Sequence, residues 1–124
     1  MSLLQHLRSY HGDWMPKKEE LNVLFANRPS LPFTVYPSGI EITARPVIAD
    51  TLITETFTMN PRSGDMMPMV DYYRYVINYQ IDSPNEYAIY FDTDPQTFYP
   101  AELIYIYEID TYSHFLPNRF TIVV

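Results

Sequence analysis

The chain has 124 residues, no cysteine and only three glycines, and its 15 acidic and 8 basic side chains give a formal net charge of −7. Without cysteine it has no disulfide, thiolate metal site or cysteine nucleophile. The glycines are too far apart for a phosphate-binding loop or a nucleophile elbow. The length predicts one domain spanning residues 1–124, in which a helical segment at residues 1–28 packs on a β domain at residues 31–124.

The acidic excess lies entirely in the second half of the chain. Residues 1–62 carry six basic and six acidic side chains, whereas residues 63–124 carry two and nine, together with ten of the 12 tyrosines. Direct binding to nucleic acid or to anionic lipid is disfavoured, since both need lysine and arginine. We expect a protein partner with a basic surface. No apolar run predicts a signal peptide or membrane anchor, so we expect a cytoplasmic protein, or a virion protein if it is viral.

Two short helices are expected at the start of the chain. Ser2 is the predicted N-cap of a helix over residues 3–10, and Gly12 is expected to end that helix in a left-handed conformation. A second helix is expected over residues 17–28, with Pro16 in its first turn. Leu21, Leu24 and Phe25 form its predicted apolar stripe.

From Leu31 onward the apolar pattern changes to period two, which predicts strands. Residues 69–81 give the strongest strand prediction, because alternate positions carry large apolar side chains. Other strands are expected at residues 40–48, 51–59, 86–92, 101–112 and 120–124, and residues 92–100 are expected to form a loop. We therefore predict a mainly β, α+β fold, which is an antiparallel sandwich or barrel of about seven strands with a short N-terminal helical pair.

No group of residues predicts catalysis, a cofactor or a metal site. The three histidines, His6, His11 and His114, are expected at the surface or in loops, and we do not expect an enzyme. Asp92 and Asp94 end a predicted strand before Pro95, which favours a capped turn. A calcium site there remains an alternative, and it would need further ligands such as Asp82 or Glu86.

Tyrosines among charges on the predicted outer strand faces are candidate partner-binding residues, since interface hot spots favour rigid aromatic and arginine side chains. Nearby acids would attract a basic partner. Methionines at a loop tip adapt to irregular partner surfaces. Core packing of the tyrosines and a sugar-binding aromatic face are the alternatives. The candidate partner-binding residues are Tyr72, Arg74, Tyr90, Asp92, Asp94, Glu108, Asp110, Tyr112, Met66 and Met67.

The uncharged segment at residues 120–124 would be an aggregation-prone edge strand if it were exposed, so we expect it to pair within its own sheet or with a neighbouring subunit. The functional hypothesis is a non-enzymatic protein–protein interaction module. We expect it to be a homo-oligomer or a structural, assembly subunit of a larger particle, of the kind found in phage or viral virions. The alternative is a small acidic inhibitor that binds the basic surface of a nucleic-acid-processing enzyme.

Overall fold

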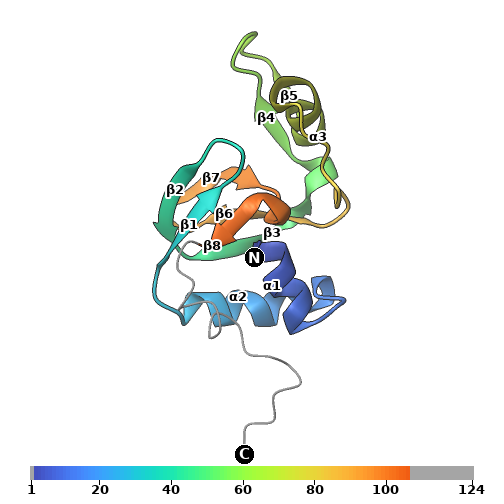
Figure 1. Ribbon diagram of the computed structural model, residues 1–124. Helices are drawn as coiled ribbons and strands as arrows, with labels where there is room; N and C mark the ends of the chain where they lie inside the picture. The colour runs from blue at the N-terminus through green and yellow to red at the C-terminus, as the bar shows by residue number, and fades with distance from the viewer. Residues whose placement is uncertain (1, 107–124) are drawn as a thin grey trace, which may run out of the picture.

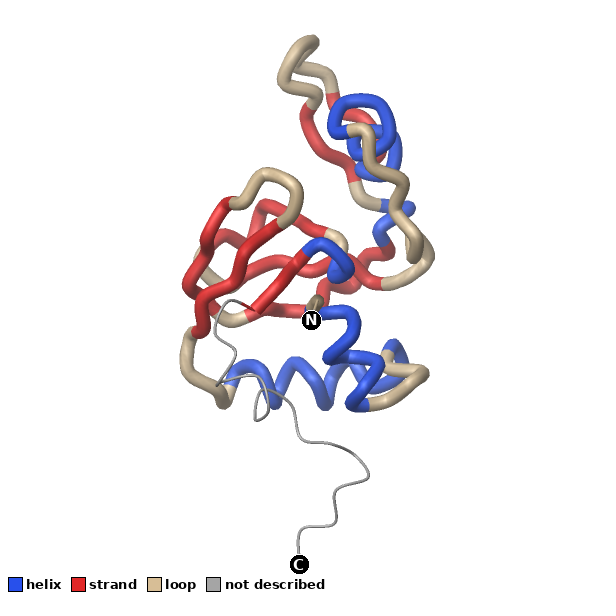
Figure 2. Tube along the Cα trace, in the orientation of Figure 1, coloured by secondary structure: helices blue, strands red, loops and turns tan. Residues whose placement is uncertain are grey.

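The computed structural model describes residues 2–106, and in this range the protein combines helices with antiparallel strands (Figures 1 and 2). We call the two N-terminal helices and the two three-stranded sheets the body. We call residues 57–77, which project from it, the lobe (upper right in Figure 1). No helix within the described range is both long and apolar enough to cross a membrane. The predicted mixture of helices and antiparallel strands is confirmed.

The two N-terminal helices form as predicted. Helix α1 spans Leu3–Tyr10, and Ser2 forms a capping box with Gln5, whose side chain bonds back to the Ser2 N–H at 2.7 Å. A short 3₁₀ turn at Met15–Lys17 contains Pro16 and leads into α2, Lys18–Ala26. The Gly12 prediction is wrong, because α1 ends at His11 in an extended conformation and Gly12 has no positive φ.

The strands of the body form two separate antiparallel sheets with the orders β2-β1-β8 and β3-β6-β7. Among the described residues they do not close into a barrel, and the alternative prediction of a single sandwich is not confirmed. A single strand was predicted at residues 40–48, but the chain passes between the sheets at Arg45. The strands of the body are β1 Leu31–Val35, β2 Ile40–Ala44, β3 Pro46–Leu52, β6 Tyr87–Phe91, β7 Asp94–Tyr99 and β8 Ile104–Ile106.

One apolar core joins the two sheets and the N-terminal helices. The rings of Phe33 in β1 and Phe91 in β6 lie 5.3 Å apart, and both side chains are almost fully buried. Leu7 and Phe25 bring α1 and α2 into the same cluster. The helices are therefore part of the core and close one side of the strands.

His6 is also buried on α1, contrary to the expected surface position, and this burial lowers the pKa of its imidazole. His11 lies at the end of the same helix, where its Nδ1 accepts a hydrogen bond from the Asp13 N–H at 3.0 Å. His114 lies outside the described residues.

The lobe corrects the strongest strand prediction. Residues 69–77 form one turn of α-helix, α3 at Met69–Tyr72, followed by the π-helical turn η3 at Tyr73–Ile77. In the strand predicted at residues 69–81, Tyr73 and Tyr75 would share one face, but Tyr73 is buried and Tyr75 is 72% exposed. The helical segment ends at Asn78, whose N–H bonds to the Tyr73 carbonyl, and the left-handed backbone of Asn78 directs the Tyr79 N–H to the same carbonyl at 2.7 Å.

A two-stranded hairpin, β4 Phe57–Met59 and β5 Met66–Pro68, forms the rest of the lobe. Residues 51–59 were predicted as one strand, but they divide among the end of β3, a 3₁₀ turn at Ile53–Glu55 and β4. The Met69 N–H bonds to the Thr56 carbonyl at 2.8 Å, which fixes the start of α3 beside the hairpin.

Two further predictions concern the last strands. Residues 92–100 were expected to be a loop but include β7, which pairs with β6 through a shifted register. The strand predicted at residues 101–112 begins instead with a 3₁₀ turn at Ala101–Leu103 and continues as β8. The rest of that strand, and the one predicted at residues 120–124, lie outside the described residues.

Candidate functional site

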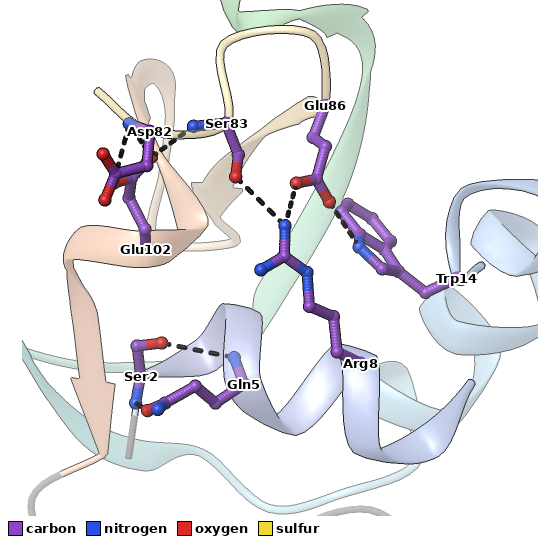
Figure 3. Close-up of polar contacts among 8 residues, drawn as sticks. All are labelled: Ser2, Gln5, Arg8, Trp14, Asp82, Ser83, Glu86 and Glu102. Carbon is purple, nitrogen blue, oxygen red and sulfur yellow. Dashed lines mark hydrogen bonds and ion pairs between the residues drawn. The ribbon is translucent and has the colours of Figure 1, made fainter. Parts of the chain in front are cut away.

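Two regions of the molecule are candidates for a functional site. One is a network of polar side chains beside α1, and the other is an apolar groove between the body and the lobe. In the network, both carboxylate oxygens of Glu86 accept strong hydrogen bonds (Figure 3). The Arg8 guanidinium donates to Oε1 and the Trp14 indole N–H donates to Oε2, each at 2.6 Å. Arg8 also donates to the Ser83 hydroxyl at 3.0 Å.

Glu102 binds the same loop from the other side. Its carboxylate accepts the backbone N–H groups of Asp82 and Ser83 at 3.1 Å and the hydroxyl of Tyr79 at 2.8 Å (Figure 3 shows the backbone contacts). Burial, followed by the hydrogen bond to Glu102, raises the pKa of Tyr79. Because the acceptor oxygens of both glutamates are used within the protein, we interpret this network as structural: it fixes the loop that returns from the lobe to the body.

The groove consists of two adjoining hollows of about 340 and 380 Å³. The inner hollow lies between the β1–β2 turn and the lobe, and its wall includes Tyr36, Ile40, Tyr72 and Tyr99. The outer hollow lies between β7 and the hairpin, next to Phe57, Met59 and Met66. The two share lining residues from β4, α3 and β7, namely Thr58, Met69, Thr97 and Phe98.

Spacing along the helical segment explains why it lines the inner hollow. Met69, Tyr73 and Ile77 are four residues apart, so they project from one side of the segment, and all three face the hollow. Burial raises the pKa of the Tyr73 hydroxyl, and burial together with nearby Asp94 raises that of Tyr99. Both phenols therefore stay neutral at physiological pH, and no side chain lining either hollow is charged.

The hairpin contributes an exposed apolar face. Phe57 pairs with Pro68 and Met59 pairs with Met66, so these four side chains lie on one face of the two-stranded sheet. Phe57, Met59 and Met66 are each more than half exposed. Among the described residues, five of the eight exposed large apolar side chains line the two hollows. Such a concentration is typical of an interaction surface, whereas scattered exposed apolar residues are not.

The structure brings only part of the predicted partner-binding set to this groove. Tyr72 lines the inner hollow and Met66 lines the outer one. Met67 is half-buried in β5 and lines neither hollow. Arg74 is exposed on the lobe, with its guanidinium 5.9 Å from the centre of the Tyr75 ring.

The other predicted residues lie elsewhere. Tyr90 packs edge-on against Phe98 with ring centres 5.9 Å apart and belongs to the smaller core cluster beneath the lobe. Asp92 forms an ion pair with Arg45 at 3.4 Å and accepts the Arg45 backbone N–H. Asp94 accepts the Thr97 hydroxyl at 2.7 Å. Glu108, Asp110 and Tyr112 lie outside the described residues.

The proposed calcium ligands do not converge. Asp92 and Asp94 are engaged at the β6–β7 turn, whereas Glu86 is held by Arg8 and Trp14. Within residues 2–106 no three histidine, aspartate or glutamate side chains are placed to share a metal ion.

Sequence reasoning missed Tyr36, Ile40, Phe57 and Phe98 as groove residues. Phe57 and Met59 did carry a signal, because apolar residues at alternate positions of a strand share one face, and that face needs a second layer to cover it. Comparison with known proteins gives no further guide: no model of a protein family matches the chain, and no curated protein matches it.

Proposed function

We propose that the protein is a non-enzymatic protein–protein interaction module and that the groove between the body and the lobe is its docking surface. The observation that carries this proposal is the concentration of exposed Tyr36, Ile40, Phe57, Met59 and Met66 around two uncharged hollows. Aromatic and methionine side chains are enriched at protein interfaces, tyrosine is among the residues that most often dominate the binding energy, and methionine adapts its shape to the partner.

The arrangement also supports the more specific role of an assembly subunit. The groove walls come from the β1–β2 turn, β4, α3 and β7, so the docking surface depends on how the lobe is placed on the body. A partner that enters the groove would contact both parts and stabilise their arrangement. A subunit of a larger particle uses contacts of this kind to build a defined assembly.

The alternative role, an acidic inhibitor, remains a prediction without a specific supporting observation. Asp92, one of its proposed contacts, is paired with Arg45. Asp94 is partly satisfied by Thr97. Both carboxylates therefore have partners within the protein.

A site-specific photo-crosslinker tests the docking surface. The photoreactive amino acid is placed at Met66 in the groove or, as a matched control, at Val23 on α2, because these side chains are 61% and 60% exposed. After irradiation of the native host, we expect discrete protein adducts from position 66 that are missing from position 23. The same adducts at both positions, or none from position 66, would contradict the proposed docking surface.

A further inference from the structure

We infer that the groove takes residues 111–124 of a second copy of this chain, which would make the protein a reciprocal dimer. This inference rests on the proposed docking function and specifies its partner. It combines the shape and charge of the groove, the direction in which the described chain ends, and the sequence that follows.

The groove suits an extended segment. One wall is the outer side of β7, which pairs only with β6 among the described strands. The two hollows lie along this strand and share Thr97 and Phe98. An extended chain can place side chains two residues apart into successive hollows on one face. The occupant should therefore carry several large apolar side chains at close spacing.

Charge restricts the occupant further. The lining is uncharged, but Asp94 lies at its edge, where it accepts the Thr97 hydroxyl and, after burial, is the second cause of the raised pKa of Tyr99. A segment with apolar anchors, a basic group and no acid would match this environment, because a carboxylate entering it would lose hydration beside Asp94.

Residues 111–124 have these properties. The segment contains no aspartate or glutamate, whereas the 48 residues from 63 to 110 contain nine. It carries Arg119 and His114, and Arg119 is the only lysine or arginine after Arg74. Its large apolar side chains are Phe115, Leu116, Phe120, Ile122, Val123 and Val124.

The direction of β8 favours binding of residues 111–124 to the groove of a second copy over binding to the groove of the same chain. Strand β1 runs toward the Tyr36–Ser38 turn, which lines the inner hollow. β8 is antiparallel to β1, with Ile104 opposite Val35 and Ile106 opposite Phe33. The described chain therefore ends while running away from its own groove. Reciprocal exchange of the segment between two copies fills both grooves without reversing this direction and gives a closed dimer.

The test measures the mass of the full chain by light scattering over a range of concentrations. We expect a dimer that dissociates on dilution. The groove variant Ile40→Asp and the segment variant Ile122→Asp should each raise the dimer dissociation constant by about a hundredfold or more, since the reciprocal dimer has two contacts and each variant loses a large buried apolar side chain from both. The control Val23→Asp, at an equally exposed site on α2, should leave the constant unchanged.

Mixing the two variants distinguishes exchange between copies from other modes of association. One Ile40→Asp chain and one Ile122→Asp chain together retain one intact groove and one intact segment. A carboxylate in an apolar contact should abolish that contact, so the mixed pair keeps one intact contact whereas either variant alone keeps none. Differently tagged variants should therefore co-purify as a heterodimer at concentrations where each alone is monomeric. A synthetic peptide of residues 111–124, added to the unmodified protein, should also dissociate the dimer, and this measurement does not depend on the folding of any variant.

A protein that is monomeric at all concentrations, or a dimer that neither Ile122→Asp nor the peptide weakens, would overturn the inference. The crosslinking experiment separates this failure from that of the docking function. Adducts from Met66 to a different protein, with none between copies, would leave the docking surface in place and exclude the second copy as its partner.

Discussion

The body and the lobe bury their large apolar side chains to very different extents. In the body, Phe33, Phe91, Trp14 and Phe25 are almost fully covered. In the lobe, Phe57, Met59 and Met66 are more than half exposed, while buried Met69 and Tyr73 anchor the helical segment in a smaller core cluster. Stability therefore resides mainly in the body, and the lobe keeps much of its apolar surface free for a partner.

The largest expected difference in the free energy of unfolding is between alanine substitutions of one phenylalanine in the body and one in the lobe. Phe33→Ala removes a fully buried ring that packs on Phe91 and should lower the free energy of unfolding by about 3–5 kcal/mol. Phe57→Ala removes a ring that is 56% exposed and should change it by less than about 0.5 kcal/mol. Urea unfolding of both variants measures the difference. Similar losses in the two variants would show that the lobe is as tightly packed as the body.

The next largest change in stability is expected from the Glu86 network, because this network fixes the loop through which the chain returns from the lobe to the body. Glu86→Ala leaves the buried Trp14 indole N–H and the Arg8 guanidinium without their acceptor, so we expect a loss of about 1–3 kcal/mol in urea unfolding. Glu86→Gln is the matched control, since its amide oxygen can still accept the Trp14 N–H. An alanine variant no less stable than the glutamine variant would contradict a structural role for these hydrogen bonds.

The helical segment of the lobe shows why the sequence was misread there. Met69, Tyr73 and Ile77 are spaced by four, which fits one face of a strand and one side of a helix equally well. The position of Tyr75 distinguishes the two structures, since a strand would have buried Tyr75 with Tyr73, whereas the helical segment leaves Tyr75 exposed. Local spacing alone could not distinguish these two structures.

The groove could be predicted only where its residues carry a local signal. Met66 was recognised because methionines at a loop tip adapt to irregular partner surfaces, and Tyr72 because it lies beside charged residues in the sequence. Ile40, Phe57 and Phe98 come from three distant parts of the chain and meet only in the folded protein. In contrast, the N-cap of α1 at Ser2 depends on a contact within four residues and was predicted correctly, although the predicted end of that helix at Gly12 was not. The groove residues that were missed depend on tertiary packing, which no local pattern encodes.

The smallest expected effect tests whether the lobe unfolds independently of the body. Gly64, in the hairpin turn, has a φ of 76°, a conformation that costs a residue with a side chain about 1–2 kcal/mol. Gly12 in the body has no positive φ, and neither glycine has an atom near an added Cβ. Gly64→Ala should therefore destabilise by about 1 kcal/mol, whereas Gly12→Ala should be neutral or slightly stabilising.

Amide hydrogen exchange locates this effect. The Gly64 N–H bonds to the Asn60 carbonyl and the Asn60 N–H to the Asp65 carbonyl, both at 2.8 Å, so these two amides report directly on the turn. Gly64→Ala should speed exchange at residue 60 about fivefold, because about 1 kcal/mol is a factor of about five in the opening equilibrium. If the lobe opens independently, the body variant Phe33→Ala should speed exchange in β1 and β6 but leave the rate at residue 60 unchanged. Acceleration of residue 60 by Phe33→Ala would instead mean that body and lobe unfold as one unit. The exposed apolar face of the hairpin would then be held in place by the body core, ready for a partner without prior ordering.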